Sequence, residues 1–142
     1  MPRFVFWDTA AFVALGNRRD GLHQLAIEVS TTLASESAII VTTDAVLTET
    51  VNTFSQAQWR RLAALLIESF EQSLQVGSAR LIHIDEALWK RGWHLFMERT
   101  DKDWSLTDCI SFVVMDDLDI KAAFTADRHF EQAGYTRLMK LG

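Results

Sequence analysis

The sequence predicts an α/β fold in which a mostly parallel sheet is covered by helices on both faces. Short stretches rich in β-branched and aromatic residues alternate with longer stretches whose apolar residues recur every three or four positions. The first short stretch, Phe4-Val-Phe-Trp7, is continuously apolar, as expected of a central strand buried on both faces. Strands separated by helices usually pair in parallel, because the crossover between parallel strands needs the length of a helix.

The expected strands and helices follow one another along the whole chain. Strands are expected near residues 3–8, 38–43, 79–84, 121–125 and 136–140, and helices near residues 9–17, 20–36, 44–55, 57–76, 86–99, 106–118 and 128–133. The second strand is as apolar as the first, and the helix over 57–76 has a leucine-rich stripe. The helix over 86–99 includes Trp89 and Trp93 in an apolar pattern, which favours core packing over a surface for stacking bases. The central sheet is therefore expected to be twisted and about five-stranded.

Composition limits the classes of protein that the chain can represent. A length of 142 residues with 49% hydrophobic residues suits one well-filled core, so residues 1–142 are expected to form a single domain. No apolar stretch is long enough for a membrane span, and the start lacks a signal-peptide pattern, so a cytoplasmic protein without membrane contact is expected. The single cysteine, Cys109, excludes an internal disulfide and is expected to be a buried, inert thiol.

Four carboxylates occur where a structural role alone is hard to justify. Asp8 and Asp127 each close an apolar strand, and Glu49 and Asp108 fall in the first turns of expected helices. The carboxyl ends of strands in open α/β sheets are where such folds bind ligands. Carboxylates brought together repel one another unless they are protonated or bridged by a cation, so the set predicts a divalent metal site.

Each carboxylate also has a simpler structural interpretation, which the sequence leaves open. Asp8 and Asp127 suit the N-cap of the helix that follows each of them. Ser105-Leu-Thr-Asp108 matches a capping box, in which the acidic side chain bonds back to the cap residue. Glu49 is harder to explain in this way, because it lies between apolar residues of an expected buried face, where an unpaired carboxylate is unfavourable. If the sheet order reverses beside the first strand, Asp8 and Asp127 lie side by side.

Other kinds of site are not supported by the sequence. There is no G-x-S-x-G elbow for a nucleophilic serine and no P-loop for a nucleotide. The net charge of −5 argues against broad binding to duplex DNA, which depends on Lys and Arg. It does not exclude a nucleic-acid substrate, because a bound cation would reverse the local charge.

The ordered set of motifs resembles the PIN-domain ribonucleases, and specifically the VapC-like toxins of type II toxin–antitoxin systems. The resemblance covers essentially the whole chain and is carried by Phe6-Trp-Asp-Thr9, Thr42-Thr-Asp-Ala-Val-Leu-Thr-Glu49, Trp104-Ser-Leu-Thr-Asp108 and Thr125-Ala-Asp-Arg-His-Phe130. It implies a three-layer α/β/α PIN domain. Asp8, Glu49 and Asp108 match the three core acids of the family, and Asp127 matches the fourth, more variable acid. All four would be catalytic residues and metal ligands.

The resemblance implies a cytoplasmic endoribonuclease that needs Mg²⁺ or Mn²⁺, forms a homodimer and is neutralised by a cognate antitoxin. The ion would activate a water molecule for attack on the RNA phosphate. Lys102, Arg128 and His129 are candidate phosphate contacts, and Thr9 and Ser105 are further candidate substrate contacts, although each also suits a surface position. A housekeeping PIN-domain nuclease in RNA processing remains an alternative. A noncatalytic PIN-like or receiver-like binding module is another.

Overall fold

The strands and helices of the structure follow the predicted order closely. The computed structural model describes residues 3–140. Its elements are β1 (Phe4–Trp7), α1 (Thr9–Gly16), α2 (His23–Ser35), β2 (Ile39–Thr43), α3 (Asp44–Thr53), the 3-10 turn η1 (Ala57–Trp59), α4 (Arg60–Gln75), β3 (Ala79–Ile82), α5 (Glu86–Glu98), α6 (Leu106–Asp117), β4 (Ala122–Phe124), α7 (Arg128–Gln132) and β5 (Thr136–Arg137). The expected helix over 57–76 is divided into η1 and α4, and the other elements differ from expectation only at their ends.

The strands form one parallel sheet in the order β3-β2-β1-β4-β5. β1 is central, with Phe6 opposite Val41 of β2 on one side and opposite Ala123 of β4 on the other. The order reverses beside β1, so the carboxyl ends of β1 and β4 lie next to each other, as predicted. The backbone N–H of Asp8 extends this pairing by donating to the carbonyl of Phe124 at 3.2 Å.

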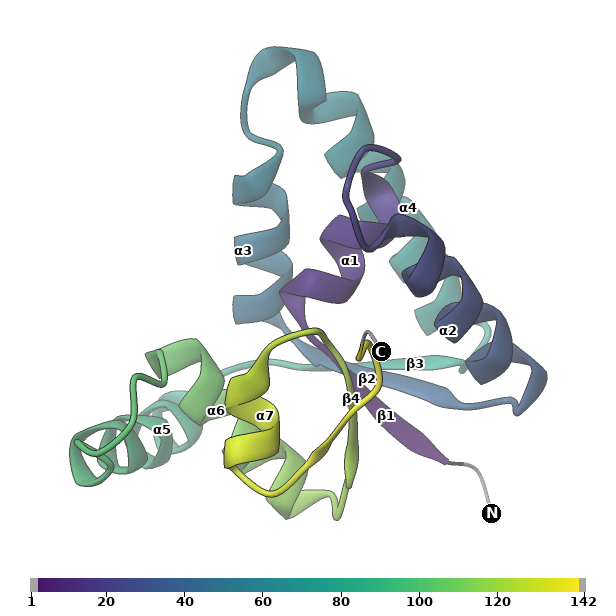
Figure 1. The fold of residues 1–142 in the computed structure, drawn as a ribbon. Coiled ribbons are helices and arrows are strands. Elements are labelled where there is room, and N and C mark those ends of the chain that lie inside the picture. The colour runs from purple at the N-terminus through teal and green to yellow at the C-terminus, as the bar shows by residue number, and fades with distance from the viewer. Residues whose placement is uncertain (1–2, 141–142) are drawn as a thin grey trace.

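Helices cover both faces of the sheet, which confirms the predicted three-layer α/β/α architecture. Figure 1 shows α1 to α4 above the sheet and α5 to α7 below it. The strands run toward the side from which α3 and α5 leave, so this side is the carboxyl edge. α3 rises from this edge and α5 extends away below it. The edge therefore opens between an upper and a lower group of helices.

The most buried helix is α6, which follows the predicted capping box. Its residues from Asp108 to Met115 are all buried. α5 approaches it closely at Gly92, where a side-chain carbon would clash with the side chain of Ile110 and lie 3.3 Å from its Cα. Burial raises the pKa of the Cys109 thiol to about 11, which agrees with the expected inert thiol.

The expectation that the tryptophans of α5 pack in the core is wrong. Trp89 and Trp93 are 46% and 44% exposed, and their rings stack with centroids 5.7 Å apart. The buried face of α5 is formed by Leu88 and Gly92 instead. The apolar residues of α5 thus extend around more of the helix surface than α6 covers. None of the helices within residues 3–140 has the length and apolar character that a membrane crossing requires.

Candidate metal centre

Asp8 follows β1 directly and is only 7% exposed. Its side chain does not cap α1, so the capping interpretation does not account for it. Its Oδ2 accepts a hydrogen bond from the hydroxyl of Thr125 at 2.9 Å. Burial is the main reason that the pKa of Asp8 rises to about 7; the Thr125 hydrogen bond opposes the rise, and the nearby charges of Asp108 and Asp127 add to it.

Asp108 combines a structural role with a place in the centre. It completes the predicted capping box of α6, because its Oδ2 accepts from the N–H of Ser105 at 3.2 Å and its own N–H donates to the Ser105 hydroxyl at 3.0 Å. The same Oδ2 lies 2.9 Å from Nδ1 of His129. Asp108 is 8% exposed, and its pKa is raised mainly by burial, against the opposing effect of His129.

Asp127 and His129 enter the centre from the start of α7. The Asp127 carboxylate caps α7 by accepting from the N–H of His129 at 2.9 Å, so this capping interpretation is confirmed. The N–H of Asp127 donates to the Thr125 hydroxyl at 3.1 Å. Nδ1 of His129 lies 3.5 Å from Oδ1 of Asp127. One ligand atom from each of Asp108, Asp127 and His129 therefore lies within 4.8 Å of the other two.

Glu49 occupies a different environment from the one predicted. It is exposed, because the buried face of α3 is formed by Val46 and Thr50. Glu49 therefore does not lie on a buried apolar face, and that prediction is wrong. Glu49 is nevertheless connected to the centre, since its Oε2 accepts a hydrogen bond from the hydroxyl of Thr9, the residue after Asp8, at 3.1 Å. It does not share the compact group formed by Asp108, Asp127 and His129.

The remaining candidate substrate contacts have different surroundings. The Thr9 and Ser105 hydroxyls are engaged with Glu49 and with the N–H of Asp108. Arg128 is exposed at the start of α7, and Lys102 lies in the loop between α5 and α6. Arg128 is the better placed of these two cations, since it adjoins both Asp127 and His129 in the chain.

Two residues of the centre escaped the sequence analysis. Thr125 is fully buried, and its hydroxyl joins Asp8 to the N–H of Asp127. The sequence feature that could have identified Thr125 is its position after β4 and two residues before Asp127. Arg137 on β5 donates from Nη1 to the carbonyl of Ala126 at 2.8 Å and so supports the turn that carries Asp127. Nothing in the local sequence pattern points to Arg137, because its contact depends on the pairing of β5 with β4.

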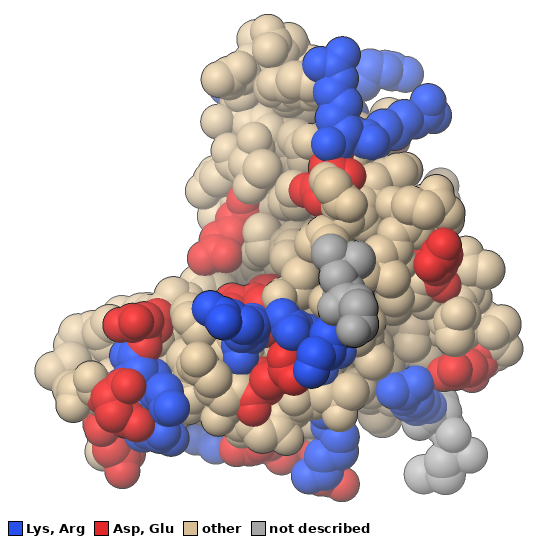
Figure 2. All heavy atoms as spheres, viewed as in Figure 1, with Lys and Arg blue, Asp and Glu red and all other residues tan. Residues whose placement is uncertain are grey.

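The charge balance of the centre favours a cation. Within residues 3–140, no Lys or Arg side chain forms an ion pair with Asp8, Asp108 or Asp127, and His129 is the basic group in contact. Two buried carboxylates, Asp8 and Asp108, beside the half-buried Asp127 are unfavourable together unless they are protonated or bridged by a metal. Figure 2 shows acidic atoms at the inner end of a recess between the two groups of helices, with basic atoms beside them over the α7 region. Carboxylates and an imidazole are suitable ligands for a divalent ion.

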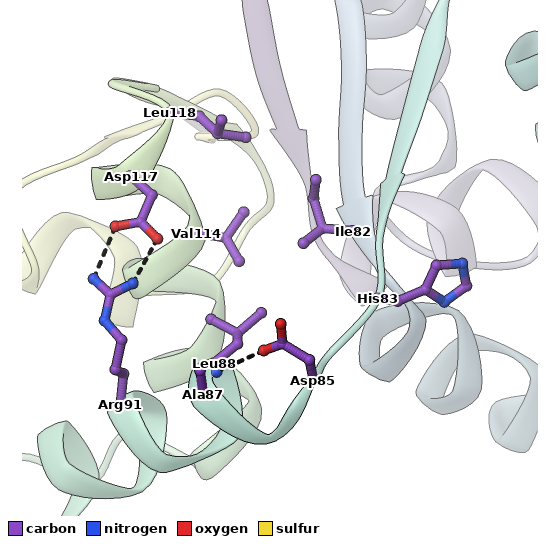
Figure 3. Close-up of a pocket in the computed structure, with 9 residues that line it drawn as sticks. All are labelled: Ile82, His83, Asp85, Ala87, Leu88, Arg91, Val114, Asp117 and Leu118. Atoms are coloured by element: carbon purple, nitrogen blue, oxygen red, sulfur yellow. Dashed lines mark hydrogen bonds and ion pairs between the residues drawn. The ribbon is translucent and has the colours of Figure 1, made fainter.

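A separate pocket lies beside the edge strand β3 and has no acidic cluster. It has a volume of about 270 Å³ and is lined by residues of β3, α5 and α6 and of the segment between β3 and α5, including Ile82, Asp85, Arg91 and Asp117 (Figure 3). Its charged groups are already paired: Arg91 makes two hydrogen bonds to Asp117, at 2.7 and 2.8 Å, and Asp85 caps α5. None of the four predicted site acids lines it.

Comparison with known proteins identifies similar chains, including proteins of Mycobacterium tuberculosis. No family model matches the sequence. The chain is 28% identical over 134 residues to the 23S rRNA-specific endonuclease VapC20 of Mycobacterium tuberculosis, in two strains, covering 94% of this chain and 97% of VapC20. The crystal structure of M. tuberculosis VapC20, described as a sarcin–ricin loop cleaving toxin, superposes with a TM-score of 0.79 at 26% identity and covers 93% of this chain and 96% of that one.

The parallel sheet order and the helices on both faces form an α/β/α domain with acids at its carboxyl edge, and this fold matches that of the VapC20 structure. Similarity to VapC20 over nearly the full length of both chains confirms the predicted resemblance to the VapC-like toxins within this class.

Proposed function

We propose that the chain is a metal-dependent endoribonuclease of the VapC type, which hydrolyses phosphodiester bonds of RNA. The observation that carries the proposal is the meeting of Asp8, Asp108 and Asp127 at the carboxyl edge without a Lys or Arg partner in the described residues. A divalent ion bound there would lower the pKa of a water molecule and neutralise charge on the phosphate. If the fold served only as a binding module, the close placement of these three carboxylates would have no explanation.

In this proposal the residues of the centre divide into metal ligands, residues that orient the ligands, and a phosphate contact. Asp8, Asp108 and Asp127 hold the metal, and Glu49, which accepts a hydrogen bond from the Thr9 hydroxyl, is the fourth acid of the centre. The capping hydrogen bonds of Ser105 and the bridging hydroxyl of Thr125 fix the orientation of the acids. Arg128 is the leading candidate for a phosphate contact, because it is exposed next to the acidic centre. The ion is Mg²⁺ or Mn²⁺.

The experiment is RNA cleavage by the purified protein with and without divalent metal. Since VapC20 is specific for 23S rRNA and cleaves its sarcin–ricin loop, a synthetic sarcin–ricin hairpin is the first substrate to test, beside an unrelated hairpin. Asp8→Asn and Asp108→Asn should lower cleavage by at least about a hundredfold, while the exposed control Asp119→Asn should not. Full activity of both folded site variants would overturn the proposal, and so would cleavage that survives a chelator.

We also infer a biological setting from the resemblance to the VapC-like toxins. In this setting residues 1–142 act as one PIN domain that forms a homodimer, works in the cytoplasm and is neutralised by a cognate antitoxin. Production of the wild-type chain should stop bacterial growth, and co-production of the antitoxin from the neighbouring gene should restore it. A housekeeping nuclease would instead be tolerated at the same level. Sedimentation of the isolated chain tests the homodimer.

A further inference from the structure

The geometry around His129 resembles a set of metal ligands more closely than a set of substrate contacts. Nδ1 of His129 lies 2.9 Å from Oδ2 of Asp108 and 3.5 Å from Oδ1 of Asp127, and one ligand atom from each of the three residues lies within 4.8 Å of the other two. Adjacent ligands of an octahedral ion with bonds of about 2.1 Å are separated by about 3 Å. The two distances from Nδ1 of His129 are close to this separation, so its contacts with both carboxylates are compatible with neighbouring corners of one coordination shell.

The protein also fixes the orientation of this group from two directions. The Asp127 carboxylate accepts from the backbone N–H of His129, which holds both residues in the first turn of α7. The N–H of Ser105 donates to the same Oδ2 of Asp108 that faces the imidazole. The side chains of His129 and Asp127 are 30% and 34% exposed and that of Asp108 is 11% exposed, so the group opens to solvent on the side of α7. An ion can enter from that side without unfolding the centre.

We propose that His129 is a metal ligand of this centre, and that with Asp108 and Asp127 it forms a mixed nitrogen and oxygen site that favours Mn²⁺ over Mg²⁺. This inference rests on the metal site that the proposed function requires. Mg²⁺ prefers oxygen ligands and retains its water molecules, whereas imidazole nitrogen binds first-row transition metals well. A site made of carboxylates alone would lack this source of selectivity.

The direct test is the electron paramagnetic resonance of Mn²⁺ bound to the full-length protein. A coordinated imidazole transfers spin density to its nitrogen, so pulsed measurements should detect ¹⁴N coupling in the wild type. Labelling histidine with ¹⁵N should replace that coupling with the ¹⁵N signal. The coupling should be lost in His129→Gln and should persist in His94→Gln, because His94 is 81% exposed at its side chain and pairs with Glu98 on α5.

Metal titration by calorimetry gives a second, independent measurement. His129→Gln should weaken Mn²⁺ binding by about tenfold or more and change Mg²⁺ binding far less, because the lost ligand is the nitrogen. His94→Gln should leave both affinities unchanged. If His129→Gln does not fold, the double variant His83→Gln/His94→Gln tests the assignment, because it should retain the ¹⁴N coupling. The remaining histidine, His23, contacts the carbonyl of Ala14 through its Nδ1.

The outcomes distinguish this inference from the proposed function. Absence of ¹⁴N coupling in the wild type, or equal weakening of both ions in His129→Gln, would overturn the role of His129. If RNA is still cleaved with metal in that case, the proposed function stands without it. If the coupling is present and assigned to His129 but no RNA substrate is cleaved, the ligand assignment stands and the proposed function fails.

Discussion

Thr125 connects two acids of the centre through one hydroxyl group. The hydroxyl donates to Oδ2 of Asp8 at 2.9 Å and accepts from the N–H of Asp127 at 3.1 Å, in a fully buried position. A hydroxyl can make both hydrogen bonds because it carries one donor and two acceptor sites. Thr125 therefore fixes the separation between the end of β1 and the turn after β4.

Replacement of Thr125 by Val should remove both hydrogen bonds while nearly preserving volume. The change leaves the buried Asp8 carboxylate and the N–H of Asp127 without this partner, so the free energy of unfolding should fall by about 1–3 kcal/mol. Metal affinity should fall as well, because Asp8 and Asp127 are no longer held together. Thr125→Ser retains the hydroxyl and is the matched control. Urea unfolding and metal titration of both variants test this, and equal behaviour of Val and Ser would contradict it.

At the scale of elements, Arg137 joins β5 to the turn that carries Asp127. Its side chain is 14% exposed, with Nη1 on the carbonyl of Ala126 at 2.8 Å and Nη2 on Glu131 of α7 at 2.7 Å. Glu131 also pairs with Lys140, at 3.1 Å, but Lys140 is largely exposed. Arg137 and Lys140 thus share the Glu131 carboxylate. Arg137 also donates a hydrogen bond to the turn that carries Asp127.

Arg137→Met should therefore loosen the segment from Ala126 to His129, whereas Lys140→Met should not. Loss of the largely buried guanidinium should lower the free energy of unfolding by about 1–3 kcal/mol, and loss of the exposed lysine by less than about 1 kcal/mol. Hydrogen exchange of the backbone amides at the start of α7 measures the local effect. Equal exchange rates in both variants would show that Arg137 does not position the turn.

The contact between α5 and α6 depends on the missing side chain at Gly92. An alanine there would push against Ile110, whose Cα lies only 3.3 Å from the position of the added carbon. Gly92→Ala should lower the free energy of unfolding by about 1–3 kcal/mol, because overpacking outweighs the better helix propensity of alanine. Gly21→Ala, where the added carbon meets nothing within 4 Å, is the control. Thermal unfolding measures the stability of the two variants. A Gly92→Ala variant more stable than the wild type would contradict the close contact between α5 and α6.

These elements also explain how far the sequence could predict the structure. Apolar strands ending in Asp8 and Asp127 are local patterns, and parallel pairing of β1 and β4 follows from the general order of such sheets. The burial of α5 residues was predicted less well, because α6 covers only the side that carries Leu88 and Gly92. The exposure of Glu49 depends on which face of α3 meets the core. Such facing relations are set by packing between elements, which a single sequence does not contain.

At the scale of the whole molecule, the acidic centre links stability to pH. The pKa of Asp8 is raised from 3.8 to about 7 in the folded chain, mainly by burial. The fold thus favours the protonated form, and this contribution to stability is present below about pH 4 and is lost as the pH rises through about 7. Ion-paired acids such as Asp117, whose pKa is lowered by Arg91, act in the opposite sense. Comparison of the wild type with Asp8→Asn isolates the Asp8 contribution from theirs.

The metal-free wild type should therefore lose stability relative to Asp8→Asn between pH 4 and pH 8, by an amount on the order of a few kcal/mol. Adding Mn²⁺ at a hundred times its dissociation constant should raise the free energy of unfolding of the wild type at pH 8 by about 2.7 kcal/mol. It should restore much less at pH 5, where Asp8 is protonated, and little to Asp8→Asn at either pH. Urea unfolding of metal-stripped and metal-loaded protein from pH 4 to pH 8 measures all of these differences. A stability difference between wild type and variant that stays constant with pH would mean that Asp8 is ionised throughout, and a metal effect of equal size in both would place the ion away from Asp8.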